Sequence, residues 1–304
     1  MERIGKYVIH QAVVTSGSAR IVLCHDPDLQ IPVAIKLFAP RADGPLSPAQ
    51  QMARFVAEAR TLASFDHAYI VGVKVMEQLP DGRPYFVMPF LAAHLPYEIG
   101  KDFADPAIGA ASPDERDRPR RMYGQRALVV LKQLSAAALA LHRRGMVHRF
   151  IRPSNILLTA TQNGAIKLCD FSMVKLPERN LPLPDHWMGA AEYTAPEQRE
   201  SATTVSPAAD VYSIGLVGYR ILTGLLPDPA AGAVDLPGDF PTVLVDLIRA
   251  CTDPDPSKRP PHAGEVLNGL DRVPPPRPSP AKPVVQVMQP RRAAAAAGQA
   301  AAES

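Results

Sequence analysis

Two short stretches in the middle of the chain decide its fold: His148-Arg149-Phe150-Ile151-Arg152-Pro153-Ser154-Asn155 and, 15 residues after Asn155, Asp170-Phe171-Ser172. The amide of Asn155 and the carboxylate of Asp170 offer the oxygen ligands that a hard cation such as Mg²⁺ prefers. The plainer alternatives are a helix cap for Asn155 and a turn residue for Asp170. The residues around them, Arg152-Pro153-Ser154 and Phe171, favour a metal site.

Five further signatures accompany these stretches in a fixed order. They are Val33-Ala34-Ile35-Lys36, Glu58 within a helical pattern, Ala195-Pro196-Glu197, Asp210-Val211-Tyr212-Ser213 and Asp255-Pro256-Ser257-Lys258-Arg259-Pro260. With them the chain resembles the eukaryotic-like serine/threonine protein kinases of bacteria over about residues 5–271, as a degenerate, pseudokinase-like member. The resemblance implies an α+β, bilobal fold, with a small antiparallel β N-lobe that holds one helix and a larger, mainly α C-lobe.

The pattern along the chain agrees with that architecture. Apolar, β-rich runs predict strands at 7–14, 19–24, 31–38, 70–78 and 85–90. Ser47, Pro48 and Gln50 predict the start of a helix with a capping box. From residue 121 onward helical spacing prevails, and the apolar run 211–222, followed by Gly224, predicts a buried helix.

These runs divide the chain into an N-lobe at 1–91, a C-lobe at 92–271 and a Pro/Ala-rich tail at 272–304. The polar segment 101–120, with three prolines, is expected to be a surface loop. Seven prolines lie between 274 and 290, so the tail is expected to be extended and disordered. A proline-motif ligand for a partner is the alternative interpretation of the tail.

Composition excludes several classes of protein. The chain has 304 residues, of which 46% are hydrophobic and 21% charged, and this is typical of a globular protein. No run of 18 apolar residues occurs, which argues against a transmembrane segment, and the start of the chain lacks a signal peptide. Three scattered cysteines argue against a disulfide framework or a zinc cluster, and favour the cytoplasm. A net charge of +3 is too small to indicate nucleic acid as a partner.

The resemblance implies ATP and Mg²⁺ as ligands. Lys36 would reach the nucleotide phosphates and Glu58 would hold its ammonium group in an ion pair; the alternatives are a surface lysine and a solvated helix face. Asn155 and Asp170 would bind the metal. Around the adenine, the resemblance implies Ala34, the carbonyl of Pro89 and the N–H of Leu91. Val14, Ser16 and Ala19 stand where the family has its three loop glycines, so only Gly17 remains as glycine there.

The residue that breaks the family pattern is Phe150. It stands where the family has the carboxylate that accepts or orients the proton of the substrate hydroxyl, and a benzene ring can do neither. General-base assistance is typically worth ~10²–10⁴ in rate. Arg152 replaces the neighbouring lysine, and Ala190 replaces a threonine that hydrogen-bonds the missing aspartate. No catalytic residue is therefore expected to be competent.

Other matched positions are structural in the family. The resemblance implies an ion pair between Glu197 and Arg259, packing of His148 on Phe171, and hydrogen bonds from Asp210 to the backbone around His148. Cys169 is expected to be a buried, inert thiol. Six histidines outside the signatures receive no role: His10, His25, His94, His142, His186 and His262.

The function expected from the sequence is therefore that of a pseudokinase. It would regulate or scaffold a protein partner in signalling, and would bind ATP and Mg²⁺ weakly or not at all. The alternative is an active serine/threonine kinase with an atypical catalytic loop, which transfers the γ-phosphate of ATP to a protein. A small-molecule phosphotransferase on the same fold is disfavoured equally by Phe150, and Ala195-Pro196-Glu197 favours the protein kinase branch.

Overall fold

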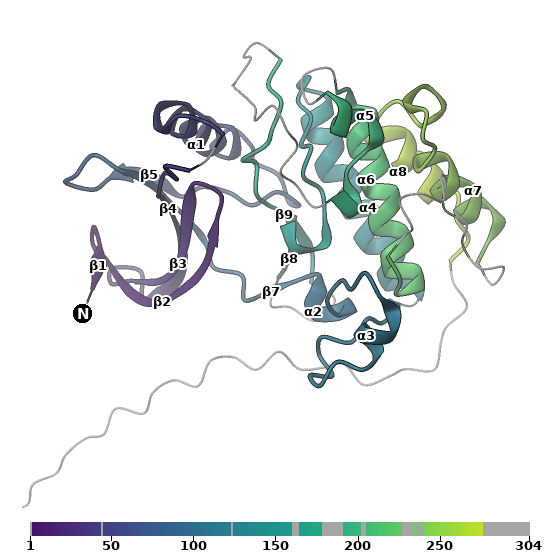
Figure 1. Ribbon diagram of the computed structural model, residues 1–304, viewed down its shortest axis with the longest axis horizontal. Helices are drawn as coiled ribbons and strands as arrows, with labels where there is room; N and C mark the ends of the chain where they lie inside the picture. Colours follow the sequence, from purple (N-terminus) through teal and green to yellow (C-terminus); the bar gives the residue numbers. More distant parts are fainter. Residues whose placement is uncertain are drawn as a thin grey trace, which may run out of the picture.

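Six antiparallel strands form a curled sheet in the first part of the chain (Figure 1). The computed structural model describes residues 2–43, 45–122, 124–159, 164–177, 191–201, 205–226, 234, 236 and 240–275. The strand order is β1-β2-β3-β4-β6-β5. Their bounds are β1 Arg3–Ile4, β2 Tyr7–Ser16, β3 Ala19–Asp26, β4 Ile31–Phe38, β5 Val75–Gln78 and β6 Pro84–Pro89.

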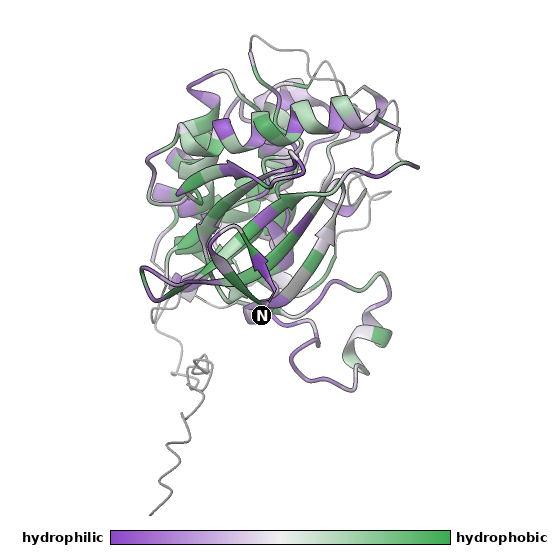
Figure 2. Cartoon of the chain, turned by 90° about the vertical axis from the view of Figure 1, so that its left-hand side faces the viewer, coloured by the Kyte–Doolittle hydropathy of each residue, from purple (hydrophilic) through white to green (hydrophobic). Residues whose placement is uncertain are grey.

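The two faces of β4 have different neighbours, because successive side chains of a strand point to opposite faces. Val33, Ile35 and Leu37 are buried in one hydrophobic cluster with residues of β2, β3 and β6. On the other face, the Phe38 ring packs against Phe55 of α1, with the ring centroids 5.5 Å apart. This register places Lys36 on the face that α1 covers, and Figure 2 shows the matching alternation of hydrophobic and hydrophilic residues along the strands.

Helix α1 (Pro48–Ala63) begins at the predicted capping box. The Ser47 hydroxyl accepts a hydrogen bond from the Gln50 backbone N–H at 3.3 Å, and the Gln50 side chain accepts from the Ser47 N–H at 2.8 Å. Two of the N–H groups that a helix start leaves without partners are thereby satisfied. The start of α1 is thus fixed by local chemistry, which fixes where Glu58 emerges ten residues further on.

The strand predicted at 70–78 is too long. Only Val75–Gln78 pairs with β6, because Ile70 forms an isolated parallel bridge with Leu168. The Val71 N–H donates to the Leu168 carbonyl at 3.0 Å, and the Leu168 N–H donates to the Tyr69 carbonyl at 2.9 Å. The first residues of the predicted strand therefore join the two lobes instead of extending the sheet.

A second, three-stranded sheet, β7-β8-β9, lies between the curled sheet and the helices (Figure 1). Its strands are β7 Ala93–His94, β8 Ile156–Leu158 and β9 Ile166–Leu168, and the 3-10 turn η1 (Pro153–Asn155) runs directly into β8. This sheet brings the two stretches that carry Asn155 and Asp170 side by side, since β8 and β9 pair with each other.

The remaining described helices form the larger lobe. They are α2 Pro96–Ile99, α3 Pro106–Ala110, α4 Gly124–His142, α5 Pro196–Glu200, α6 Pro207–Thr223, α7 Thr242–Cys251 and α8 Ala263–Asp271, with 3-10 turns η2 Ala191–Tyr193 and η3 Pro256–Lys258. Helix α6 is buried as predicted and ends at Gly224, whose φ of 77° is the left-handed conformation of a C-cap. A side-chain carbon at Gly218 would lie 2.6 Å from Ile248, so this glycine lets α6 and α7 pack closely.

The segment 101–120, expected to be a loop, contains the short helix α3 (Pro106–Ala110). It is also anchored: the Asp102 carboxylate pairs with Arg220 of α6 at 2.7 Å. Figure 2 shows the part with α3 standing out from the rest of the chain. The polar composition hid these features, since one short helix and one distant ion pair leave no periodic pattern.

The bilobal α+β fold is confirmed: an antiparallel sheet with one helix, followed by a mainly helical lobe (Figure 1). No helix in the described part of the chain is long and apolar enough to cross a membrane. The division at residues 91 and 271 stays a prediction, and 276–304 of the predicted tail lie outside the described residues.

Candidate active site

A buried ion pair joins β4 to α1. The Lys36 Nζ lies 2.7 Å from Oε1 and 2.8 Å from Oε2 of Glu58. Lys36 is 4% exposed and Glu58 2%. These two residues are therefore neither a surface lysine nor a solvated helix face. Breaking such a pair leaves one buried charge uncompensated, which costs about 3–5 kcal/mol.

Asp170 completes this charge cluster from the larger lobe. Asp170 is the second residue after the end of β9, and its Oδ1 lies 3.3 Å from Lys36 Nζ. Burial by itself would lower the pKa of Lys36, but the Glu58 and Asp170 carboxylates outweigh it and raise that pKa above its ordinary value. Burial would raise the pKa of Asp170, yet Lys36 and a hydrogen bond from Ser172 hold it below its ordinary value. The site thus holds a charged ammonium and an ionised carboxylate in contact.

Asn155 lies beside Asp170. The Cys169 N–H donates to the Asn155 carbonyl at 3.0 Å. The Asn155 Nδ2 donates to the Phe150 carbonyl at 2.8 Å, and this partner assigns the amide orientation. With Nδ2 engaged in this way, Oδ1 remains as the acceptor of the side chain.

The donor set fits Mg²⁺. Asp170 supplies a carboxylate and Asn155 an amide oxygen, and Mg²⁺ commonly takes one or two protein oxygens and keeps water and phosphate as its other ligands. Within the described part of the chain, no group of three or more His, Cys, Asp or Glu side chains could hold a metal. Asn155 and Asp170 could hold a metal ion only together with water or phosphate ligands, and their role as metal ligands stays a prediction.

Asp210, at the start of α6, fixes the backbone at the start of the stretch 148–155, which we call the catalytic loop. Its carboxylate accepts the N–H groups of His148 and Arg149, both at 2.8 Å, as expected. The His148 ring is buried and meets Phe171 edge-on, with ring centroids 4.8 Å apart. His148 and Phe171 thus contribute packing, and Asp210 sets the direction in which the loop leaves His148.

His142, which received no role from the sequence, belongs to the same network. Its Nε2 lies 2.9 Å from Asp210 Oδ2, and its Nδ1 accepts the Ala263 N–H at 3.1 Å. These partners assign the proton to Nε2. No local signal marks His142, because its partners lie 68 and 121 residues away along the chain.

Phe150 occupies the position at which the family pattern has a carboxylate. The guanidinium carbon of Arg152 lies 5.7 Å from the centre of the Phe150 ring. Arg152 Nε is buried and has no hydrogen-bond partner among the described residues. Asp170 and Asp210 are both engaged, the first by Lys36 and the second by His142 and the loop N–H groups. Both carboxylates are therefore already bonded to cationic or N–H groups.

The protein kinase domain family matches residues 7–268 of the chain. The chain belongs to the protein kinase family. This kinase domain is similar to three bacterial proteins described as serine/threonine-protein kinases. They are PknA of Mycobacterium tuberculosis (30% identical over 315 residues, covering 96% of the chain and 66% of the relative), drp72 of Corynebacterium efficiens (29% over 281, 88% and 50%) and Pkn1 of Myxococcus xanthus (31% over 230, 74% and 30%). The chain thus spans about two thirds or less of the length of these relatives. It is a member of the eukaryotic-like kinases of bacteria, as the resemblance implied.

The kinase domain places the predicted adenine residues next to one another. Ala34 pairs with Met88, and Val33 pairs with Pro89 at the end of β6. Ala34 and Lys36 are two residues apart on β4, so they share a face of the sheet. Leu91 lies two residues after the end of β6 and is half-buried. The pairing brings Ala34 and Pro89 close together, and their role in adenine binding stays a prediction.

The glycine-poor loop of the kinase domain is a tight hairpin turn. Ser16 pairs with Ala19, and Gly17 has a φ of 54°. No heavy atom lies within 4 Å of a side-chain carbon built at Gly17, so this glycine serves the turn and not a close approach. The Val14 side chain is 49% exposed. Of the loop residues, Gly17 alone keeps the backbone freedom that the family has at three positions.

Arg54, four residues before Glu58 on α1, was missed by the sequence analysis. Its Nε and Nη2 donate to the Ser172 carbonyl at 3.1 and 2.5 Å. Arg149 Nε donates to the next carbonyl, that of Met173, at 2.6 Å. Burial lowers the pKa of Arg149 to about 10, and Arg54 adds to this effect. The sequence marks Arg54 only by its spacing of four residues from Glu58, which places both side chains on one face of α1.

Three further expectations concern the Glu197–Arg259 ion pair, the Cys169 thiol and Ala190. Glu197 and Arg259 form the expected ion pair, with contacts of 2.7 and 2.9 Å. The Cys169 thiol donates to the Asn155 carbonyl at 3.3 Å, and burial raises its pKa, which agrees with an inert thiol. Ala190, like the stretch 178–190 around it, lies outside the described residues, so its predicted role stays a prediction.

Proposed function

We propose that this kinase domain binds ATP with Mg²⁺ and acts as a pseudokinase, through binding of a protein partner and not through efficient phosphoryl transfer. One combination of features carries the proposal. Lys36 is bonded to both Glu58 and Asp170, whereas Phe150 stands at the proton-acceptor position. The charges that a nucleotide needs are assembled, and the group that a hydroxyl needs is missing.

The residues would divide the work in a simple way. The Lys36 ammonium would bind nucleotide phosphate oxygens, with Glu58 holding it in place. Asn155 and Asp170 would hold Mg²⁺, which when bound supplies positive charge to the phosphates. Phe150 provides no lone pair for the proton of an attacking hydroxyl. The loss of general-base assistance raises the barrier by about 3–5.5 kcal/mol, or ~10²–10⁴ in rate.

Nucleotide binding is tested by thermal unfolding with ATP, with and without Mg²⁺. We expect ATP to raise the unfolding temperature, since a ligand that binds only the folded state stabilises it in proportion to its saturation. Lys36→Met should abolish the rise, and the matched control Lys74→Met, on an exposed lysine of the same lobe, should retain it. Absence of a shift at millimolar ATP would leave partner binding alone as the function.

An active serine/threonine kinase is the second candidate, because a pure scaffold has no need of the bidentate Lys36–Glu58 pair or of an ionised Asp170. Radiolabelled ATP and a generic basic protein substrate separate the two. The pseudokinase proposal predicts turnover far below the ~1–100 s⁻¹ of ordinary kinases. Turnover in that range, lost in Asp170→Asn but kept in the surface control Asp271→Asn, would establish the active enzyme instead.

The partner or substrate is proposed to be a protein, because the similar bacterial proteins are serine/threonine-protein kinases. A location in the cytoplasm stays a prediction from the cysteine pattern. Both proposals apply to this chain, which covers only part of the length of those relatives.

A further inference from the structure

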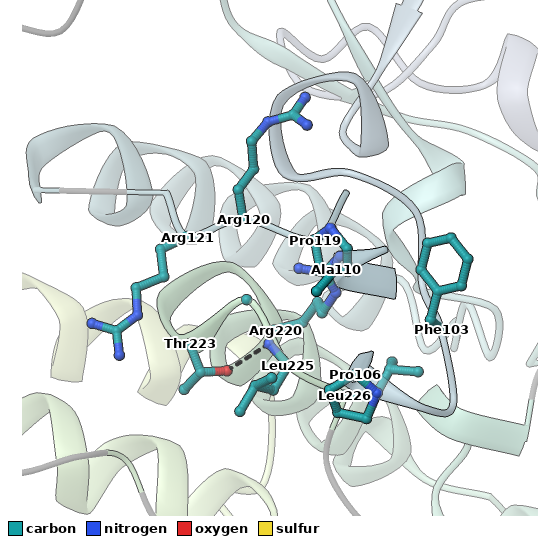
Figure 3. A pocket seen from close by; sticks show the side chains of 11 residues that line it. Phe103, Pro106, Ala110, Pro119, Arg120, Arg121, Arg220, Thr223, Leu225 and Leu226 are labelled. Atoms are coloured by element: carbon teal, nitrogen blue, oxygen red, sulfur yellow. Dashed lines mark hydrogen bonds between the residues drawn. The ribbon is translucent and has the colours of Figure 1, made fainter. Parts of the chain in front are cut away.

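A pocket of about 300 Å³ lies at the C-terminal end of α6, against the segment that carries α3 (Figure 3). None of its lining residues belongs to the candidate active site. Most of its wall is apolar and comes from Phe103, Pro106, Pro119, Leu225 and Leu226. The lining also includes three arginines and no carboxylate. The size of the pocket suits one or two side chains, since small-molecule sites begin at about this volume.

Arg220 gives the pocket a specific chemical demand. It is 1% exposed, and its Nε donates to Asp102 at 2.7 Å. Its Nη2 is within 3.0–3.3 Å of three backbone carbonyls in the 99–101 segment. Its Nη1 is buried and has no hydrogen-bond partner among the described residues. A buried donor without an acceptor is costly, so this nitrogen favours a ligand that brings an acceptor.

The charge around Arg220 favours an anionic acceptor. Arg120 also lines the pocket, and its guanidinium donates to five backbone carbonyls, which leaves its charge without a neutralising carboxylate in these bonds. In Figure 3 the Arg220 side chain reaches toward Pro119 and Ala110, whereas Arg120 and Arg121 extend outward from the wall. A carboxylate entering the pocket would meet positive charge in a wall that includes Arg220.

Two exposed apolar residues lie in or next to the segments that form the pocket. Ile108, on α3 between two residues that line the pocket, is 62% exposed. Leu225, in the wall itself, is 43% exposed. Exposed apolar side chains grouped around a cavity are typical of a binding site for another protein.

We propose that this pocket docks a segment of a protein partner that carries an apolar side chain next to a carboxylate. The chain's own residues after 275 do not fit this description. They contain Arg277, Lys282, Arg291 and Arg292 against the single acid Glu303, so they have the same sign of charge as the pocket. A partner of opposite charge is the occupant that the arginines select.

The pocket is connected to the active-site side of the lobe. Asp102, the partner of Arg220, also accepts the Tyr193 hydroxyl at 2.9 Å. Tyr193 lies two residues before Ala195-Pro196-Glu197, and its carbonyl accepts the Ser213 hydroxyl of α6 at 2.7 Å. Two hydrogen bonds, Arg220 to Asp102 and Tyr193 to Asp102, thus connect a segment docked at Arg220 to the Ala195-Pro196-Glu197 stretch. The inference does not depend on phosphoryl transfer, so it holds for a pseudokinase and for an active kinase.

The test is fluorescence anisotropy without nucleotide, with labelled peptides and the full chain. The probe is Glu-Glu-Leu-Phe-Glu-Glu, compared with Gln-Gln-Leu-Phe-Gln-Gln and Glu-Glu-Ala-Ala-Glu-Glu. We expect saturable binding of the first peptide and at least about tenfold weaker binding of the other two, since each lacks one half of the recognition chemistry. Because no nucleotide is present, failure here is separate from failure of the proposed function.

Substitutions at Leu225 test the location without disturbing buried Arg220. Leu225→Glu should weaken binding of the acidic peptide about tenfold and Leu225→Lys should strengthen it, because the substitutions add charges of opposite sign at one place. Val243→Glu is the matched control, since Val243 is an equally exposed apolar residue (42%) on α7. Ala110→Trp, which fills the pocket from α3, should also weaken binding. Circular dichroism checks that each variant is folded.

Three outcomes would overturn the proposal. The first is equal affinity for the glutamate and glutamine peptides, or no saturation at millimolar peptide. The second is a Leu225→Glu variant that binds like Val243→Glu. The third is a chain that ignores all three peptides yet binds anionic lipid vesicles in a manner sensitive to Leu225, which would assign the pocket to a membrane surface.

Discussion

Two residues of the active site hold backbone conformations that side chains rarely adopt. Arg149 has a φ of 65° and Asp170 a φ of 62°. Each such conformation costs about 1–3 kcal/mol and persists only where the surroundings enforce it. Asp210 enforces the first through the Arg149 N–H, and Lys36 binds the carboxylate of the second. The fold therefore maintains strain on both sides of the candidate site, at Arg149 and at Asp170.

Phe150→Asp tests the proposal that a carboxylate is lacking at this position. We expect phosphoryl transfer to rise, but by less than the ~10²–10⁴ of a full general base, because Arg152 lies close enough to pair with the new carboxylate. Transfer of radiolabelled phosphate is the measurement, and Phe150→Leu is the control without a carboxylate. A rise equal in both variants would mean that packing, and not proton transfer, limits the rate.

The surroundings of His148 predict that the free energy of unfolding depends on pH. Its Nε2 donates to the Cys169 carbonyl at 3.2 Å and its Nδ1 accepts the Phe150 N–H at 3.2 Å, so the folded state requires a neutral ring. Burial accordingly lowers its pKa below 6.5, against the attraction of Asp210 and Asp170. The unfolded chain then binds the extra proton. The free energy of unfolding should fall as pH decreases below about 6.5, by at most ~1.4 kcal/mol per pH unit.

The measurement is urea unfolding between pH 7 and pH 5. Asp170 and Asp210 also have lowered pKa values, but their contributions are lost only below about pH 4. His148→Gln should flatten the slope, and His94→Gln, on an exposed histidine, should leave it unchanged. An unchanged slope in His148→Gln would contradict the assignment.

At the scale of elements, sequence prediction succeeded where local chemistry sets the boundary. The strand at 31–38 and the helix after Ser47 have the predicted starts, because alternation and a capping box act within a few residues. It failed where a distant contact decides. Ile70 leaves its predicted strand to bridge to Leu168, and Asp102 in the predicted loop pairs with Arg220, 118 residues away.

The same distinction applies to the candidate site. Lys36, Glu58, Asn155 and Asp170 could be located from motifs, and the structure brings them together. Arg54 and His142 could not, because their contacts join elements that no local pattern connects. The contacts of Ala190 belong to residues outside the described part.

Ser47→Ala tests the contribution of the α1 capping box. Loss of the hydroxyl acceptor should lower the free energy of unfolding by about 1 kcal/mol, the usual cost of removing such a cap. Chemical denaturation measures it, and Ser257→Ala is a matched control at the start of the exposed turn η3. A loss no greater than in the control would show that tertiary packing alone holds the helix start.

At the scale of the whole molecule, the two lobes are joined by charge as well as by backbone. Lys36 in the sheet bonds Asp170 in the larger lobe. The hydrogen bond from Val71 to Leu168 joins the segment before β5 to β9. The family match ends at residue 268, close to the end of α8 at Asp271. We therefore expect the described fold to form without the chain beyond 275.

Removal of residues 276–304 should leave the kinase domain intact. We expect an unfolding temperature within about 2 °C of the full chain, because the family match and the last described helix both end before residue 276. The response to ATP should be unchanged as well. Differential scanning calorimetry of the shortened and full chains decides it, and a loss of cooperativity would move the predicted boundary at 271.

The buried charge cluster around Lys36 has a consequence for chemical labelling. Acylating reagents attack amines through the nitrogen lone pair, which an ammonium lacks, and Lys36 is both protonated and inaccessible behind two acids. Such reagents will mark the surface amines of this chain and pass over Lys36. Its modification would therefore report the moments at which α1 moves away from the sheet.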